Sequence, residues 1–366
     1  MSDNPVDMRG DVNASASKLL ARAAAAETRA YHGLMVAIDD FFLPEDARLD
    51  EHLRAGLATL LAGLVATVEG EIREHAVRLL SAKGEAQLVA ALAAPGASAQ
   101  ARLARSGLLR DPELMAELVG RVRQELLGAA LPMTAPDDPE RPSLINRFVQ
   151  HPDRVVAASA MAVLIAESRR RATPDTGLVQ TELPAELHHR LAWWVAAALR
   201  GRVEAPSAAL DQALSEAALR SLSAYDEGNR LEAVALRFAG AIDAQSGELP
   251  ELLVEALGDR RIVLFVALLA HALGMPYPIA REMVLDPAGD RLWLALRALD
   301  LPRASVAQIG YALSEADPRR DLESFADTLD TIAAIAAAEA RDALAPLKLH
   351  PDYRAAVIAL DRGGTR

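Results

Sequence analysis

The sequence contains no cysteine, which excludes disulfides, thiolate metal sites and thiol nucleophiles. Aromatic residues make up only 4% of its 366 residues, although hydrophobic residues make up 51%. Alanine and leucine supply most of that apolar content and favour helices, whereas the scarcer β-branched and aromatic residues favour strands. We find no stretch of strand length in which apolar and polar residues alternate. The sequence therefore predicts an all-α protein.

Positive charge is also in deficit. The chain carries 39 basic and 51 acidic residues, a formal net charge of −12, and only three of the basic residues are lysines. A surface that binds nucleic acid needs clustered positive charge. The local cluster of three arginines at residues 169–171 stands at a predicted helix end, where arginines can cap exposed carbonyl groups. We therefore expect no nucleic-acid partner.

Long hydrophobic runs are interrupted. The longest uncharged run, residues 262–280, contains Gly274, Pro276 and Pro278, which end its helix about two-thirds of the way along. This pattern predicts a buried core helix rather than a membrane span. The first fifteen residues are polar and acidic and have no signal-peptide core. We expect a cytoplasmic protein with no membrane partner.

The N-terminal region predicts two long helices. An alanine-rich helix is expected over residues 14–40, and after a turn Pro44 suits the first position of a second helix, which has no proline before Pro95. One face of the second helix is apolar over about seven turns, through Leu53, Leu57, Leu60, Leu64, Val68, Ile72 and Leu79. Gly56, Ala62, Gly63 and Ala66 allow close approach of another helix. This hairpin either joins helices near 84–93, 98–108 and 111–130 in an intramolecular bundle, or forms a homodimer through residues 14–81.

A domain boundary is predicted at residues 132–143. The stretch "PMTAPDDPERPS" holds four prolines and few apolar residues, a composition typical of a linker. The expected division is an N-terminal helical hairpin or bundle over residues 1–131, this linker, and a second domain over residues 144–366.

The second domain repeats one kind of break. "LGMPYPIAREMVLD" begins at Leu273 and "LDLPRASVAQIGYAL" at Leu299, and each ends an apolar helix, inserts a proline and starts another amphipathic run. Helix starts are expected at Asp153, Asp226, Asp259 and Asp290, where an aspartate can accept free backbone N–H groups. The spacing predicts a degenerate HEAT-like repeat of paired helices.

Two segments carry a resemblance to a known family. "ELPAELHHRLAWWVAAALR", residues 182–200, read with "HPDRVVAASAMAVLIAESRR", residues 151–170, resembles an uncharacterised alphaproteobacterial domain-of-unknown-function family. The resemblance covers about residues 110–330 and implies an all-helical fold with HEAT-like helix pairs. It implies no activity, because the family brings no catalytic residues to transfer.

The helix at residues 182–200 holds the most chemically promising cluster. Glu186 and His189 form an E-x-x-H pair on one helical face, but a di-iron site needs a second such pair and two more carboxylates, which we do not find. We therefore expect no metal and no cofactor. Trp193 and Trp194 point about 100° apart, so both are buried only if the helix is covered on two sides. Where exposed, Trp193, Trp194, His188 and His189 are the candidate partner-binding residues.

Nucleotide-binding glycine loops and a nucleophile elbow are absent from the sequence. The sequence favours a non-catalytic scaffold or regulatory adaptor that binds protein partners through its helical repeats. The alternative is a helical enzyme or small-ligand sensor with a site between the two domains. A pocket lined by convergent polar groups favours the alternative, whereas a long open groove favours the adaptor.

Overall fold

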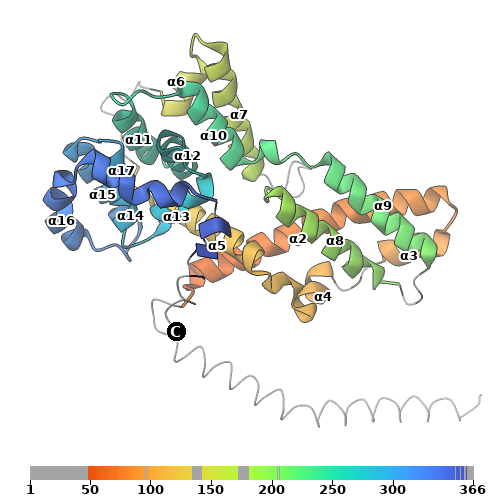
Figure 1. Cartoon of the computed structure of the whole chain (residues 1–366). Helices are drawn as coiled ribbons and strands as arrows, with labels where there is room; N and C mark the ends of the chain where they lie inside the picture. The colour runs from red at the N-terminus through yellow and green to blue at the C-terminus, as the bar shows by residue number, and fades with distance from the viewer. Residues whose placement is uncertain are drawn as a thin grey trace, which may run out of the picture. The chain divides into compact units, whose positions relative to one another are not determined.

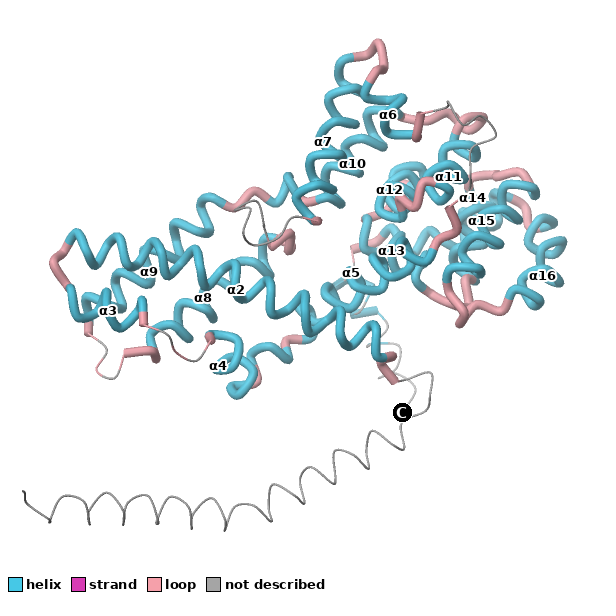
Figure 2. The backbone as a smooth tube through the Cα atoms, turned by 180° about the vertical axis from the view of Figure 1, so that it is seen from behind, coloured by secondary structure: helices cyan, strands magenta, loops and turns pink. Residues whose placement is uncertain are grey.

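In a computed structural model of the chain, the described residues are 48–94, 96, 98–133, 142–171, 181–203, 205, 207–350, 352–354, 356–357 and 360. Throughout them the regular structure is helical, without a strand (Figures 1 and 2), which confirms the predicted all-α class. The α-helices are α2 (Glu51–Ala82), α3 (Ala86–Ala93), α4 (Ala99–Ser106), α5 (Pro112–Ala130), α6 (Leu144–Val149), α7 (Arg154–Arg170), α8 (Ala185–Arg200), α9 (Ala208–Ala224), α10 (Leu231–Ile242), α11 (Leu249–Gly258), α12 (Ile262–Leu273), α13 (Tyr277–Leu285), α14 (Asp290–Ala298), α15 (Arg303–Ala316), α16 (Leu322–Ala334) and α17 (Ala337–Leu344).

The contacts group residues 55–366 as one compact unit and separate it from residues before Ala55. The predicted helix at 14–40 lies outside the described residues, as do residues 134–141 of the predicted linker. Within the compact unit, α5 packs on α12, α13 and α15, so helices from before and after the proline-rich segment share one set of contacts. The division at 132–143 stays a prediction.

The long helix α2 has the apolar face that its sequence predicts. Leu57, Leu64, Val68 and Ile72 are buried, whereas Leu60 and Leu79 are half-buried. Gly56 is the point of close approach, because a β-carbon there would lie 2.6 Å from Cγ1 of Val122 on α5. The predicted helices near 84–93, 98–108 and 111–130 are confirmed as α3, α4 and α5. Burial of the face within one chain supports the intramolecular bundle, and the homodimer stays a prediction.

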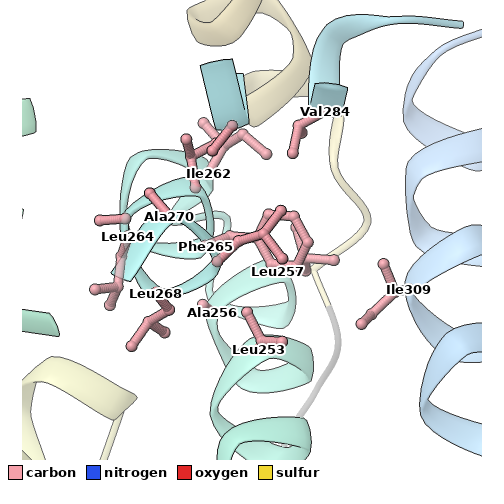
Figure 3. Packing of buried hydrophobic residues seen from close by; sticks show 14 of the residues in the cluster. Leu253, Ala256, Leu257, Ile262, Leu264, Phe265, Leu268, Ala270, Val284 and Ile309 are labelled. Atoms are coloured by element: carbon pink, nitrogen blue, oxygen red, sulfur yellow. The ribbon is translucent and has the colours of Figure 1, made fainter. Parts of the chain in front are cut away.

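The core of the C-terminal region surrounds α12. Figure 3 shows Phe265 of this helix packed among side chains of α11, with Val284 of α13 and Ile309 of α15 nearby. The helix is apolar on nearly every face because it is covered on nearly every face. The predicted buried core helix is confirmed.

By length and composition alone, α2 is the one described helix that could cross a membrane, and α12 with α13 passes only as a pair bent by 119°. The buried face of α2 carries a charged residue, Glu69, whose carboxylate accepts a 2.5 Å bond from Arg202.

The repeated break has a common backbone geometry. Gly274 and Asp300 both adopt left-handed φ angles, of 62° and 56°. The residues after them, Met275 and Leu301, donate their N–H groups to carbonyls five residues back, and a proline N-caps the next helix in both cases. This is the Schellman pattern of helix termination. It recurs without a proline at Arg260, with φ of 58°, between α11 and α12.

The order of packing departs from the order of the sequence. Helix α7 packs against α10, while the intervening α8 and α9 pack against each other and α8 also contacts α4. Helices that stack only on sequence neighbours are the mark of an ordinary repeat, so the HEAT-like repeat stays a prediction.

The predicted aspartate starts are confirmed only in part. Asp153 caps α7, accepting from the N–H of Val155, and Asp226 caps a short 3-10 turn before α10. Asp259 instead follows the end of α11 and accepts a bond from the N–H of Leu144. Asp290 lies inside α14 after Gly289, without a capping bond. Aspartate caps a helix only where the preceding backbone places its carboxylate over the first turn.

Candidate functional site

The structure separates the four predicted partner-binding residues of α8. His188 is buried: its Nδ1 lies 2.9 Å from Oγ1 of Thr181, its ring stacks on Tyr225 at 3.9 Å, and its Nε2 has no hydrogen-bond partner among the described residues. His189 is exposed and accepts a 3.2 Å bond at Nε2 from Nε1 of Trp193. Trp193 and Trp194 are both half-buried. His189 and the two tryptophans therefore retain surface that a partner can reach, and their binding role stays a prediction.

Among the described residues, the structure brings no further metal-ligating side chain to Glu186 and His189. Across the described part of the chain, no group of three His, Asp or Glu side chains is arranged to hold a metal ion.

A buried ionic network lies where α5, α10 and α13 meet, and sequence reasoning did not anticipate it. Glu117 of α5 accepts a 2.7 Å bond from Arg281 of α13 and a 3.4 Å bond from Arg230, which precedes α10. Nε of Arg230 also donates to the carbonyl of Glu182. Both arginines are more than a hundred residues from Glu117 along the chain, so no local pattern in the sequence pairs them.

Arg170 extends this network from the end of α7. Its guanidinium donates to Glu182 at 2.5 Å and to Glu232 at 2.7 Å. The sequence predicted that the arginines at 169–171 cap a helix end. For Arg170 this prediction is wrong, because its side chain is only 9% exposed and pairs with carboxylates. A buried charge requires such partners.

Among the described residues the network joins four arginines and five glutamates. Arg121, Arg170, Arg230, Arg281, Glu117, Glu182 and Glu232 are its more deeply buried members. Glu125 and Glu227 pair with Arg121 and Arg230 at its more exposed edge. Burial acts against the charged form of Glu232, but attraction by Arg170, Arg230 and Arg121 outweighs it and lowers the pKa of Glu232 to about 2. Burial likewise acts to lower the pKa of Arg170, but Glu232 and Glu182 raise it overall. Both groups are therefore charged at neutral pH.

A cavity of about 770 Å³ opens beside the network. Its walls come from α2, α5, α7, α10 and the start of α12, and include Arg121, Arg170, Arg171, Arg260, Arg261, Gln124, Glu125 and Glu167. The described wall thus has five arginines and two glutamates, a net charge of +3 in a chain of −12.

Two buried donors in this wall lack partners. Nη1 of Arg170 and Nε2 of Gln124 make no hydrogen bond with the described residues. Gln124 is 1% exposed, and its Oε1 is taken by the hydroxyl of Tyr277 at 2.9 Å. Buried polar atoms are nearly always hydrogen-bonded in native proteins. Both residues line the cavity, although the two atoms themselves are covered by their neighbours. The gathering of five arginines in the described wall makes the cavity the candidate functional site.

Local sequence explains how the cavity wall forms. Gly128 lets α5 and α12 approach closely, because a β-carbon there would lie 2.8 Å from Cγ2 of Ile262. The Schellman break places Arg260 in the left-handed region directly before α12. Arg260 is exposed and has no ion pair with the described residues, whereas Arg261 pairs with Glu167 of α7.

A family model described as "Uncharacterised protein conserved in bacteria (DUF2336)" matches residues 137–345. The chain belongs to this family. The predicted resemblance to a domain-of-unknown-function family is confirmed. No curated protein and no solved structure matches the chain.

The DUF2336 region and the segment before it build the cavity together. Arg170, Arg260 and Arg261 fall inside residues 137–345, whereas Arg121 and Gln124 of α5 fall outside them.

The stability of the protein is expected to fall as pH drops from about 6.5 to 4. Burial, with a smaller effect of His189, lowers the pKa of His188 from 6.5 to about 4. In that interval the unfolded chain binds a proton at His188 and the folded chain does not, so acid favours unfolding. His188→Asn, which keeps a group in the place of Nδ1, should flatten the decline by up to about 3 kcal/mol.

Urea denaturation at several pH values measures this effect. His189→Asn, on the exposed side of the same helix, is the matched control and should change the pH dependence much less, because it removes only the smaller of the two effects on the pKa of His188. Identical profiles for the natural chain and His188→Asn would show that His188 does not titrate in this way.

Proposed function

We propose that this protein is a non-catalytic regulatory protein that senses a small molecule in the arginine-lined cavity. The observation that carries the proposal is the cavity itself, about 770 Å³ in volume, whose described wall has five arginines and two glutamates. A ligand with acceptor groups can pair with these arginines through charge-assisted hydrogen bonds. Apolar side chains of the same wall can cover the rest of such a ligand.

The position of the cavity suits a sensor. Its described wall combines α2 and α5 with α7, α10 and α12, helices that are far apart in the sequence. A ligand that contacts all of them stabilises the packing in which they meet and so shifts the population toward it. The volume, about 770 Å³, is in the range of small-molecule sites.

A second candidate, an adaptor that binds protein partners through residues 144–366, rests on a different observation. One face of α7 is apolar and exposed, through Val155, Met161 and Ile165, which are 66%, 43% and 46% exposed. Their spacing of six and four residues, with Ala158 and Ala162 between them, places them on one side of the helix. Apolar faces of this kind are used for protein contacts. Binding of a partner and binding of a ligand are compatible in one regulatory protein.

Ligand binding is tested by thermal denaturation of the full chain with a panel of neutral, cationic and anionic metabolites. We expect at least one compound to raise the melting temperature. Ala129→Phe places a ring in the cavity wall at an exposed helical position, and should abolish the effect. Ala130→Phe is the matched control, because Ala130 is exposed on the same helix and does not line the cavity. The proposal fails if no compound acts, or if both variants respond alike.

A further inference from the structure

We infer that the ligand of the arginine-lined cavity is an organic phosphate, a molecule with a phosphate group at one end and an apolar body at the other. The inference rests on the proposed function, that a small molecule occupies this cavity. It is drawn from the charge of the wall, from the unpaired Arg260 in it and from the helix end that contributes to it.

The acidic groups of the wall are already matched. Glu125 accepts a 3.1 Å bond from Arg121, and Glu167 pairs with Arg261 and more distantly, at 4.0 Å, with Arg171. Arg260 has no such counter-charge among the described residues, whereas Arg170 is already paired with Glu182 and Glu232. The unmatched charged group in the described wall is therefore a cation, which favours an anion and disfavours a cation.

The charged side chains that line the cavity offer mainly donors. Arginines of α5 and α7 and those directly before α12 line it, and its two carboxylates, Glu125 and Glu167, are already paired. A ligand that meets several of these arginines must present acceptors in more than one direction. A phosphate group has several acceptor oxygens around one centre, and arginine binds such groups with charge-assisted hydrogen bonds.

The N-terminus of α12 adds donors of the same kind. This twelve-residue helix begins at Ile262 without a side-chain cap, and Ile262 and Val263 both line the cavity. The first N–H groups of a helix have no partner inside it, and the helix dipole favours negative charge at this end. Arg260 and Arg261 lie directly before these N–H groups.

The rest of the wall fits an apolar body. Leu60, Leu231, Ile262 and Val263 contribute apolar side chains. The volume, about 770 Å³, is much larger than a single phosphate group needs and matches a drug-sized or nucleotide-sized molecule. Inorganic phosphate alone would leave these side chains facing water, so an organic phosphate gains binding energy that the inorganic ion lacks.

Isothermal titration of the full chain with phenyl phosphate and with inorganic phosphate, at constant ionic strength, tests the inference. We expect saturable binding of both, tighter for phenyl phosphate. Arg260→Glu should weaken both by about tenfold or more, since it replaces an unmatched cation by an anion. Arg260→Asn should weaken them less, and asparagine tolerates the left-handed backbone at this position. Arg110→Asn, an exposed arginine outside the cavity wall, is the control and should change neither affinity.

The outcomes separate the inference from the proposed function. Absence of saturable binding by both phosphates, or equal affinities for the natural chain and Arg260→Glu, overturns the inference. If in that case a neutral compound of the metabolite panel binds and Ala129→Phe abolishes its binding, the sensor proposal stands, but its ligand is not an anion. If no compound of either kind binds, both are wrong. Circular dichroism and the melting temperature without ligand confirm that each variant is folded.

Discussion

Glu117→Leu is expected to lower the free energy of unfolding by about 3–5 kcal/mol, because it leaves buried cations without their carboxylate. Glu117 accepts from Arg281 at 2.7 Å and from Arg230 at 3.4 Å, and all three side chains are largely buried. Arg281 keeps no other carboxylate within an ion pair among the described residues. Urea denaturation followed by circular dichroism measures the loss.

A matched control lies on the same helix. Glu113 pairs with Arg190 at the surface and is 69% exposed, so Glu113→Leu should change stability little. Replacing both Glu117 and Arg281 by leucine should recover part of the loss, since an apolar pair costs less to bury than one unpaired charge. Equal losses in Glu117→Leu and Glu113→Leu would contradict a role for buried charge pairing.

Gly310→Ala is expected to destabilise the protein by about 1–3 kcal/mol through overpacking. The added β-carbon would overlap the ring of Phe325, which is buried and has its ring centroid 4.6 Å from that of Trp293. The phenylalanine ring therefore has little room to retreat. Gly310 lies inside α15 and has an ordinary helical backbone, so the cost arises from packing rather than from a special φ angle.

Gly63→Ala provides the opposite expectation. Gly63 lies in α2, and a β-carbon added there would meet no heavy atom within 4 Å among the described residues. Alanine should therefore stabilise the helix by about 0.5–1 kcal/mol. Thermal and urea denaturation of both variants measure the change in the free energy of unfolding, which should be negative for Gly310→Ala and positive for Gly63→Ala. A stabilising Gly310→Ala would mean that Phe325 packs elsewhere, and Phe325→Leu in the Gly310→Ala background should restore part of the lost stability.

Helix identity was predictable because it depends on local composition and spacing. The apolar face of α2 through Leu57, Leu64 and Val68 follows the 3.6-residue period, and the described helix runs from Glu51 to Ala82. The two proline-containing breaks were also predictable, because a proline cannot continue a helix by donating its N–H. The left-handed conformation of Asp300 was not, because aspartate adopts that conformation far less often than glycine does.

The candidate site was far less predictable. Of the α8 cluster, His188 is buried and the two tryptophans are half-buried. The sequence could not predict this, because periodicity does not say how many sides of a helix are covered. The cavity wall was missed because its arginines are ordinary surface residues by composition. The triple-arginine stretch was the one available signal, and its interpretation as a helix cap used only local chemistry.

The sequence by itself determined the all-α class and the positions of most helices from α2 onward, because both depend on residues that are close together along the chain. Residues 182–200 also indicated the family to which the chain belongs. The tertiary structure alone decided that α7 packs on α10 and that Arg170 meets Glu182 and Glu232. It also decided which buried donors of the described wall were left without partners beside the cavity. Pairing of buried charges depends on which residues meet in space, so a carboxylate 62 residues along the chain satisfies Arg170 as well as a near neighbour could.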